Sequence, residues 1–202
     1  MANKGQVVEQ TVLVNGVNVK GLFDTIEAVQ SNPKLGYFRL ELRNKWLGAT
    51  QTISTVNEFH GAGQDFTRPV SFVLHSDEPG VLLGNDTAPG PGEYMLSALA
   101  ACVTTSIVYH AAARGIEIQA IESTVEGAVD LQGFLNLDKN VRKGFQNIRM
   151  SFRIKADGSD ELIQELANLG QNFSPVFETL NKGVPITIKA ERLDEKKISA
   201  VA

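Results

Sequence analysis

The chain has 202 residues, of which 43% are hydrophobic and 21% charged, as in an ordinary globular protein. This length suits one domain, or one domain with an extension. A net charge of −4 and a pI near 5.4 argue against a nucleic-acid-binding surface. A single cysteine, Cys102, excludes an intrachain disulfide and favours the reducing cytoplasm, and no apolar signal segment follows the first six residues.

Residues 1–36 are predicted to form an N-terminal extension made of a hairpin and a short helix. Asn15-Gly16, between β-branched residues, is typical of a hairpin turn. Apolar residues then recur at helical spacing up to Asn32-Pro33, which ends the helix. We expect the extension to be dispensable for folding and to pack on the main domain, residues 37–193, through Leu22, Phe23 and Ile26.

Three successive antiparallel strands are predicted before residue 77. Residues 37–43 alternate, with Phe38, Leu40 and Leu42 on one face, and this pattern indicates a half-buried strand. Residues 50–56 and 70–75 are rich in β-branched side chains and are expected to follow as strands. The glycines of the loop expected at 60–64 lack dinucleotide-binding spacing, so we expect no phosphate site there.

A segment without charged residues, Tyr94 to Ala113, predicts the central helix of the protein. Pro91 and Glu93 favour its start, and Arg114-Gly115 favours its end. A helix that is apolar nearly all round is a buried one. Its length comes close to the roughly 20 residues of a membrane span. Hydroxyl side chains and a histidine interrupt it, so we predict the core helix of a soluble protein instead.

The second half of the chain is predicted to add strands and two helices. Ser174-Pro175 is typical of the N-cap and first residue of a helix. We expect strands at 116–129 and 145–155, helices around Leu162–Leu169 and Val176–Leu180, a closing strand at Val184–Leu193 and a polar tail at 194–202. This order predicts an α+β fold in which a mostly antiparallel sheet lies against the buried helix.

Cys102 is the chemically notable residue of the central helix. A lone cysteine in the middle of a helix is usually a small buried hydrophobe, and the helix dipole gives its thiolate little help there. His110 lies on the same face about 11 Å along the axis, so we interpret it as a core or interface histidine. His60 and His75 are scattered, and neither a metal site nor a cofactor is expected.

Short motifs follow one another in a fixed order between about Arg43 and Glu191: Gly84 to Asp86, Pro91 to Leu96, Ala98 to Thr105, Ala111 to Ile116, Val129 to Leu135, Gly144 to Arg149 and Ser174 to Leu180. Together they resemble the OsmC/Ohr family of osmotically induced and organic-hydroperoxide-resistance proteins. The resemblance implies an intertwined homodimer, with antiparallel sheets wrapped around the central helix and two equivalent sites at the subunit interface. In this family a helix cysteine attacks an organic peroxide, a second cysteine resolves the sulfenic acid as a disulfide, and dithiol reductants regenerate it.

The resemblance also assigns roles to particular residues. Cys102 matches the attacking cysteine, and Glu93 lies at or one residue from the position of a glutamate that tunes it. Because Glu93 and Cys102 are nine residues apart, about 180° around a helix, Glu93 must fold back or act on the partner's thiol. Ser174 stands where the resolving cysteine is expected, and a hydroxyl forms no disulfide. Ser174 and Leu99 are expected to contact the substrate.

The family's arginine has no counterpart on the strand at residues 49–53. A cysteine without a nearby cation or hydrogen-bond donor is a poor nucleophile, because burial disfavours its thiolate. The candidates to replace that arginine are Arg43, Arg68 and Arg114, from either subunit. Arg43 lies closest in sequence to the family position, and Glu93 would orient it through a bidentate pair.

Two functions of different classes remain open at this point. The first is a one-cysteine thiol peroxidase, in which Cys102 reduces a hydrophobic peroxide and an external thiol resolves the sulfenic acid. The second is a catalytically weakened dimer that binds a small lipophilic ligand at the subunit interface. Cys102 and Glu93 favour the enzyme, whereas Ser174 and the missing arginine favour the binding protein. Both hypotheses place a homodimer in the cytoplasm, with no nucleic acid and no membrane as partner.

Overall fold

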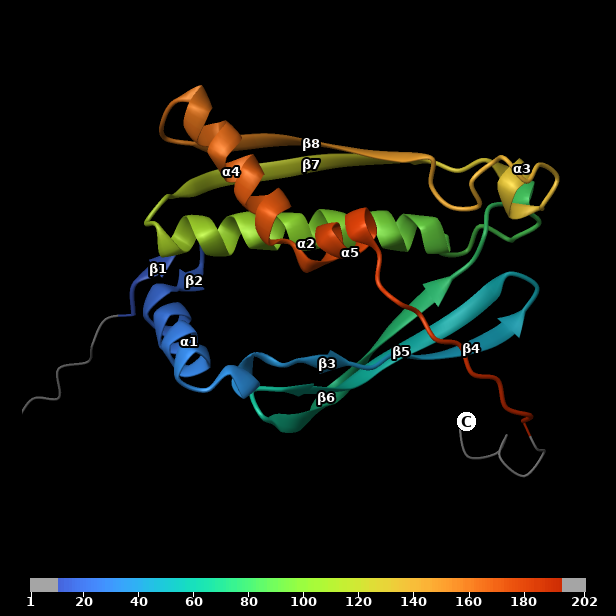
Figure 1. Ribbon diagram of the computed structural model, residues 1–202, viewed down its shortest axis with the longest axis horizontal. Coiled ribbons are helices and arrows are strands. Elements are labelled where there is room, and N and C mark those ends of the chain that lie inside the picture. The colour runs from blue at the N-terminus through green and yellow to red at the C-terminus, as the bar shows by residue number, and fades with distance from the viewer. Residues whose placement is uncertain (1–10, 194–202) are drawn as a thin grey trace, which may run out of the picture.

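The computed structural model describes residues 11–193, which are arranged in two layers (Figure 1). One layer is a sheet of four strands: β3 (Arg39–Leu40), β4 (Arg43–Gly48), β5 (Gln51–Gly61) and β6 (Gln64–Ser76). The other layer combines α2 (Pro91–Ala113), β7 (Ile118–Ala128), α3 (Leu131–Phe134), β8 (Asn147–Ala156), α4 (Asp160–Phe173) and α5 (Pro175–Lys182). All strand pairs are antiparallel, so the predicted α+β class with antiparallel sheets is confirmed.

The extension forms a hairpin of β1 (Leu13–Val14) and β2 (Val17–Asn18), followed by α1 (Val19–Ser31) and a 3-10 turn at Pro33–Gly36. Asn15 and Gly16 both have positive φ, 55° and 77°, the geometry that Asn-Gly hairpin turns require. Asn15 also attaches the extension to the core. Its Nδ2 donates to the Ile116 carbonyl (2.9 Å), and its Oδ1 accepts from the Ile118 N–H (2.7 Å).

Of the three side chains predicted to dock the extension, Leu22 is half-buried, but Phe23 and Ile26 are exposed, so the prediction is wrong for these two. Figure 1 shows α1 crossing from the end of α2 to the β3–β6 sheet, and none of its residues is buried. The two side-chain hydrogen bonds of Asn15 to the backbone at the start of β7 also hold the extension on the core.

A truncation that starts at Tyr37 is expected to stay soluble and folded, with a lower thermal midpoint. The reason is that the extension contributes no buried residue in α1 but does supply the two Asn15 hydrogen bonds to the start of β7. Thermal melts of the full-length and the truncated protein, followed by circular dichroism, would measure the change in thermal midpoint. An Asn15→Ala variant of the full chain serves as the matched control and should reproduce much of it. Global unfolding of the truncated chain would show that the extension belongs to the core.

β5 is the central strand of the four-stranded sheet. β6 pairs along one edge of it, and β3 and β4 share the other edge. β5 and β6 are joined by a tight turn at Ala62-Gly63, where both residues have positive φ. The loop predicted at 60–64 is therefore shorter than expected. The half-buried strand predicted at 37–43 is also wrong. Within it only Arg39 and Leu40, as β3, and Arg43, at the start of β4, pair with β5. Leu40 is 77% exposed, because the apolar face of this segment meets no other layer of the described chain.

The buried core lies on one side of α2. Leu99, Val103, Ile107 and Ala111 pack there against Leu166 and Leu169 of α4 and against half-buried residues of β7 and β8. Gly170 allows α4 this close, since a Cβ there would lie 2.7 Å from Val103 Cγ1. The alternating burial of β8 and the helix at Asp160–Phe173 confirm the predictions for this part of the chain.

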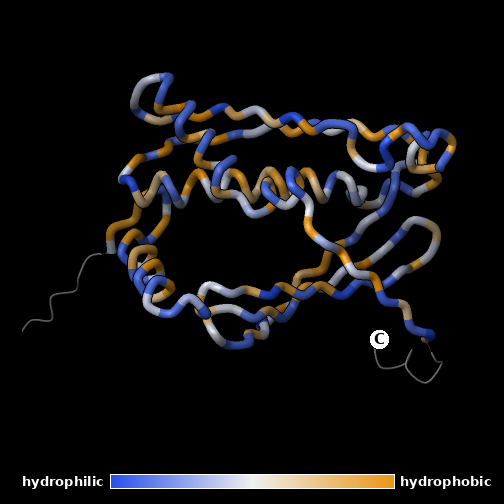
Figure 2. Tube along the Cα trace, viewed as in Figure 1, coloured by the Kyte–Doolittle hydropathy of each residue, from blue (hydrophilic) through white to orange (hydrophobic). Residues whose placement is uncertain are grey.

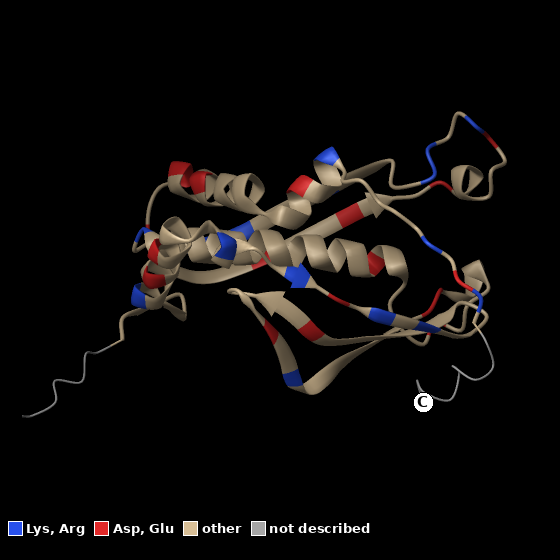
Figure 3. Ribbon diagram, turned by 60° about the horizontal axis from the view of Figure 1, so that its bottom comes forward, with Lys and Arg blue, Asp and Glu red and all other residues tan. Residues whose placement is uncertain are grey.

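The other side of α2 is open in the single chain, so the expected burial all round is not observed. Ala98, Ala101, Thr105 and Tyr109 are exposed there. Figure 3 shows the helix uncharged between its two ends. By length and composition alone α2 could cross a membrane, a test that the core helix of a soluble protein passes too. Its buried face, which forms the core, is consistent with the second interpretation.

The segment after α5 contains no strand up to residue 193, so the closing strand predicted at 184–193 is wrong for the single chain. Its apolar side chains alternate, but Ile186 and Ile188 are 82% and 88% exposed. A strand requires a partner edge, and no strand of the described residues pairs with this segment.

Asp77 joins the two layers where β6 leads towards α2. The side chain is 1% exposed and accepts hydrogen bonds from the Thr50 and Thr87 hydroxyls at 2.6 and 2.8 Å. It also accepts from the backbone N–H groups of Glu78, Asn85 and Thr87. These hydrogen bonds hold the pKa of the Asp77 carboxyl well below its usual range, and the bond from the Thr50 hydroxyl contributes most. Burial acts in the opposite direction and raises this pKa.

Asp77→Asn is expected to lower the thermal midpoint at neutral pH, because the amide nitrogen cannot accept these hydrogen bonds. A depressed folded-state pKa contributes stability above the unfolded-state pKa, which is lost as the pH falls towards the folded value. The difference in thermal midpoint between the wild type and Asp77→Asn should therefore shrink below about pH 4. Thermal melts between pH 7 and pH 3 test this, with exposed Asp24→Asn as the control. An unchanged gap across that range would contradict the account.

Candidate functional site

Cys102 lies at the middle of α2 and is half-buried. One turn further along, the Ser106 hydroxyl lies 2.9 Å from the Cys102 carbonyl and 3.3 Å from the Phe173 carbonyl. This hydroxyl therefore links the turn of α2 that carries Cys102 to the end of α4, one residue before Ser174. The structure thus brings Cys102 and Ser174 onto neighbouring turns of packed helices, although 72 residues separate them in the sequence.

Ser174 is 2% exposed and caps α5, since its Oγ accepts a hydrogen bond from the Phe177 N–H at 3.2 Å. This confirms the predicted helix start at Ser174-Pro175. Beside it, the Phe173 ring stacks on His110 with ring centroids 4.0 Å apart. Burial, assisted by the charge of Arg114, lowers the pKa of His110, so the imidazole is neutral at pH 7. His110 is half-buried and packs on Phe173, in agreement with the predicted core or interface histidine.

Glu93 lies in the first turn of α2, where it completes the N-terminal cap. Its Oε2 accepts a hydrogen bond from the Gly90 N–H at 2.7 Å. Nine residues of helix separate it from Cys102, a rise of about 13 Å. Within one chain Glu93 therefore does not reach the thiol, and it does not fold back before the helix.

The three candidate arginines have other partners within the described chain. Arg43 pairs with Glu41 and Glu58 at 3.2 and 3.3 Å. Arg68 donates to the Asn57 carbonyl at 3.3 Å and lies over the Phe59 ring, and Arg114 pairs with Glu165 at 3.3 Å. Among residues 11–193, no hydrogen bond or ion pair joins an arginine to Cys102. A cation for this thiol would therefore have to come from a rearranged arginine or from a second subunit.

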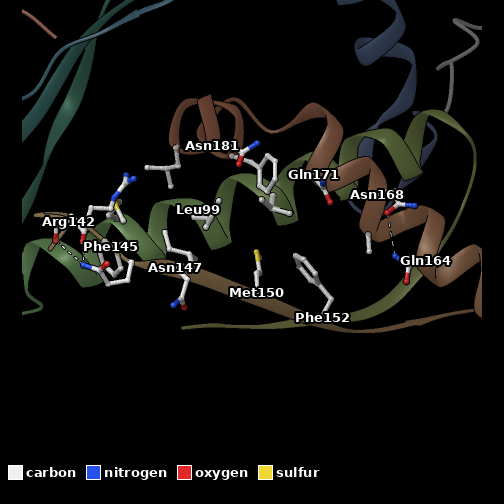
Figure 4. Close-up of a pocket in the computed structure, with 18 residues that line it drawn as sticks. Leu99, Arg142, Phe145, Asn147, Met150, Phe152, Gln164, Asn168, Gln171 and Asn181 are labelled. Carbon is white, nitrogen blue, oxygen red and sulfur yellow. Dashed lines mark hydrogen bonds between the residues drawn. The ribbon is translucent and has the colours of Figure 1, made fainter. Parts of the chain in front are cut away.

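Leu99, the other predicted substrate contact, is buried in α2 and forms part of the wall of a pocket of about 740 Å³ (Figure 4). The pocket lies between α2, β8, α4 and α5. Neither Cys102 nor Ser174 lines it. The structure therefore separates two features that the sequence had combined in one site: the cysteine on one side of the helix and the pocket on another.

Sequence reasoning missed the residues that give this pocket its polar ends. Arg142 and Asn147 lie at one end, and Gln164 and Asn168 lie at the other (Figure 4). One signal was available, since Gln164, Asn168 and Gln171 recur at helical spacing on α4. Among residues 11–193, no group of three or more His, Cys, Asp or Glu side chains could hold a metal ion.

A family model described as OsmC-like protein matches residues 84–189, from the loop before α2 to the segment after α5. This match covers more than half of the chain, so the protein belongs to the OsmC-like family. It includes Glu93, Cys102 and Ser174. No curated protein sequence matches the chain significantly.

Solved structures share the fold at low sequence identity. An OsmC-like protein from Mycoplasma pneumoniae is 17% identical, with a TM-score of 0.54 over 71% of this chain and 87% of its own. A protein from Psychrobacter arcticus, described as an osmotic stress induced and detoxification response protein, is 15% identical. Its TM-score is 0.51, over 68% of this chain and 85% of its own. These similarities establish an OsmC-like fold.

Proposed function

We propose that this protein is a one-cysteine thiol peroxidase that acts in stress defence in the cytoplasm, with Cys102 as the attacking group. The observation that carries the proposal is the placement of Cys102, half-buried at the middle of α2 and linked through Ser106 to the turn that begins at Ser174. Membership of the OsmC-like family, and the stress and detoxification response in the description of the Psychrobacter protein, support a role in stress defence.

The reaction needs an external thiol because Ser174 replaces the resolving cysteine. The Cys102 thiolate attacks one peroxide oxygen, the O–O bond breaks, and the leaving alkoxide takes a proton to become the alcohol. Cys102 is left as a sulfenic acid. A first external thiol forms a mixed disulfide with release of water, and a second thiol restores Cys102 and leaves as a disulfide. The electrons thus pass from two thiols to the peroxide.

A homodimer is part of the proposal. One side of α2 is open, and Trp46, Leu40 and Phe72 of the β3–β6 sheet are exposed too. Figure 2 shows apolar stretches along both α2 and this sheet. Soluble monomers rarely expose so many large apolar side chains together. A second copy would cover these faces, and its arginines would supply the cation that the single chain does not bring to Cys102.

A second candidate function is a dimer that binds a small lipophilic ligand at the interface without chemistry. The observation that favours it is that Arg43, Arg68 and Arg114 all have partners away from Cys102. If the dimer left these pairs intact, Cys102 would lack an activating cation and act as a small apolar residue.

The rate of Cys102 oxidation by cumene hydroperoxide, measured across pH, separates the two functions. A peroxidase requires a thiol whose pKa lies well below the roughly 8.5 of a free cysteine. The oxidation rate should therefore reach its plateau near neutral pH. Arg43→Ala should shift the plateau to higher pH, whereas Arg149→Ala, a charge change on exposed β8, should leave it in place. A rate that rises only above pH 8 in the wild type would favour the binding protein.

A further inference from the structure

The pocket between α2, β8, α4 and α5 has a size, a lining and a charge distribution that define a ligand. We infer that it binds a small single-chain amphiphile with an anionic oxygen headgroup. This site is separate from Cys102 and does not rest on the proposed peroxidase activity, because Cys102 does not line the pocket.

The middle of the pocket is apolar. Leu99 of α2 and Met150 and Phe152 of β8 line it, with Phe177 and Leu180 of α5 opposite. Figure 4 shows the Met150 and Phe152 side chains directed from the strand towards the helices. A volume of about 740 Å³ lies within the roughly 300–1,000 Å³ of small-molecule sites. Such walls favour a hydrocarbon chain over a polar ligand, because burying apolar surface is the main source of binding energy there.

A cation lies at one end of the pocket. Arg142 belongs to the segment between α3 and β8, where Lys139 and Lys143 outnumber Asp138. Its side chain is exposed, and no acidic residue within 11–193 forms an ion pair with it. The carbonyl of Arg142 is held by the Gln146 amide at 2.8 Å, which fixes this turn of the chain. A guanidinium that has no acidic partner is suited to a bidentate carboxylate or phosphate.

The polar rim argues against a second protein copy as the occupant. Asn147, Gln164, Asn168, Gln171 and Asn181 all contribute amide groups to the pocket, and among these amides the structure has only one long hydrogen bond, of 3.4 Å, between Gln164 and Asn168. Covering these amides and Arg142 with a dry apolar surface would leave polar groups unpaired, which is costly. A small ligand in a partly hydrated pocket leaves them in contact with water.

Isothermal titration of the full-length protein with decanoate, below the concentration at which it forms micelles, tests the inference. Decanoate should bind with one site per chain, and decanol and decyltrimethylammonium should bind at least tenfold more weakly. Decyl phosphate distinguishes a phosphate headgroup from a carboxylate, since the tighter of the two anions identifies the source. Equal binding of the neutral, cationic and anionic probes would overturn the inference.

Variants assign the binding to this pocket. Arg142→Ala should weaken decanoate binding at least tenfold, and Arg149→Ala, which changes the same charge on β8 outside the pocket, should not. Leu180→Trp, which fills the pocket from α5, should abolish binding while circular dichroism remains unchanged. Cys102→Ser should bind like the wild type, so loss of peroxidase activity and loss of this site are distinguishable. Arg142-independent binding would place the ligand elsewhere and refute the assignment.

Discussion

Excess cumene hydroperoxide is expected to add one oxygen atom to Cys102, and added thiol should convert that product to a mixed disulfide. No intrachain disulfide should form, because Cys102 is the only cysteine of the chain. Mass spectrometry of the intact protein and of its α2 peptide measures both products. Cys102→Ser should show neither modification and should lose thiol-dependent peroxide consumption completely.

Ser174→Cys provides a sharper form of the same experiment. The Ser106 hydroxyl lies within hydrogen-bond distance of the Cys102 and Phe173 carbonyls, so a thiol at 174 would lie on the turn next to Cys102. We expect peroxide to convert this variant to an intrachain disulfide, with loss of two hydrogen atoms instead of gain of oxygen. The cost is a weaker cap on α5, about 1 kcal/mol.

The expected products depend on Cys102 being reactive, and the experiment would reveal if it is not. An unmodified Cys102 under excess peroxide, in both the wild type and the Ser174→Cys variant, would remove the peroxidase and leave the binding protein. A sulfenic acid that persists in Ser174→Cys would instead show that the two turns lie too far apart, since a disulfide requires Cα atoms within about 7 Å.

Local signals explain why the helices and several strands could be predicted from the sequence. The limits of α2 follow from Pro91 and Gly115, and the start of α5 follows from Ser174-Pro175. Each of these depends on the residues at the boundary itself. The alternation in β8 was also sufficient, because the core that buries its apolar face belongs to the same chain.

The failed predictions concern segments whose burial depends on distant surfaces. Residues 37–43 and 184–193 alternate like strands, yet Leu40 and Ile188 are exposed because no described element covers them. The pocket was missed for a related reason: its lining comes from α2, β8, α4 and α5, and no short motif contains it. Asn15 was recognised as a turn residue, but its hydrogen bonds to residues about 100 positions away left no local pattern.

Light scattering is expected to give a mass twice the 21.9 kDa of the chain, and Ala101→Glu should shift the protein towards monomer. Ala101 lies on the exposed side of α2, in a segment with no charged residue from Tyr94 to Ala113. Glutamate is a good helix former, so the substitution costs the single chain little. Across the interface of a homodimer it would bury two unpaired charges, at about 3 kcal/mol each, which weakens the dimer roughly ten-thousandfold.

Ala28→Glu is the matched control, because it places the same change at an exposed position of α1. It should leave the dimer intact, and both variants should keep the helical content of the wild type. The peroxidase and the dimer are linked in the proposal, since the cation that activates Cys102 comes from the second subunit. Ala101→Glu should therefore slow Cys102 oxidation at neutral pH in parallel with dissociation. A well-folded wild-type monomer that oxidises rapidly would refute the interface site, because the single chain brings no arginine to Cys102.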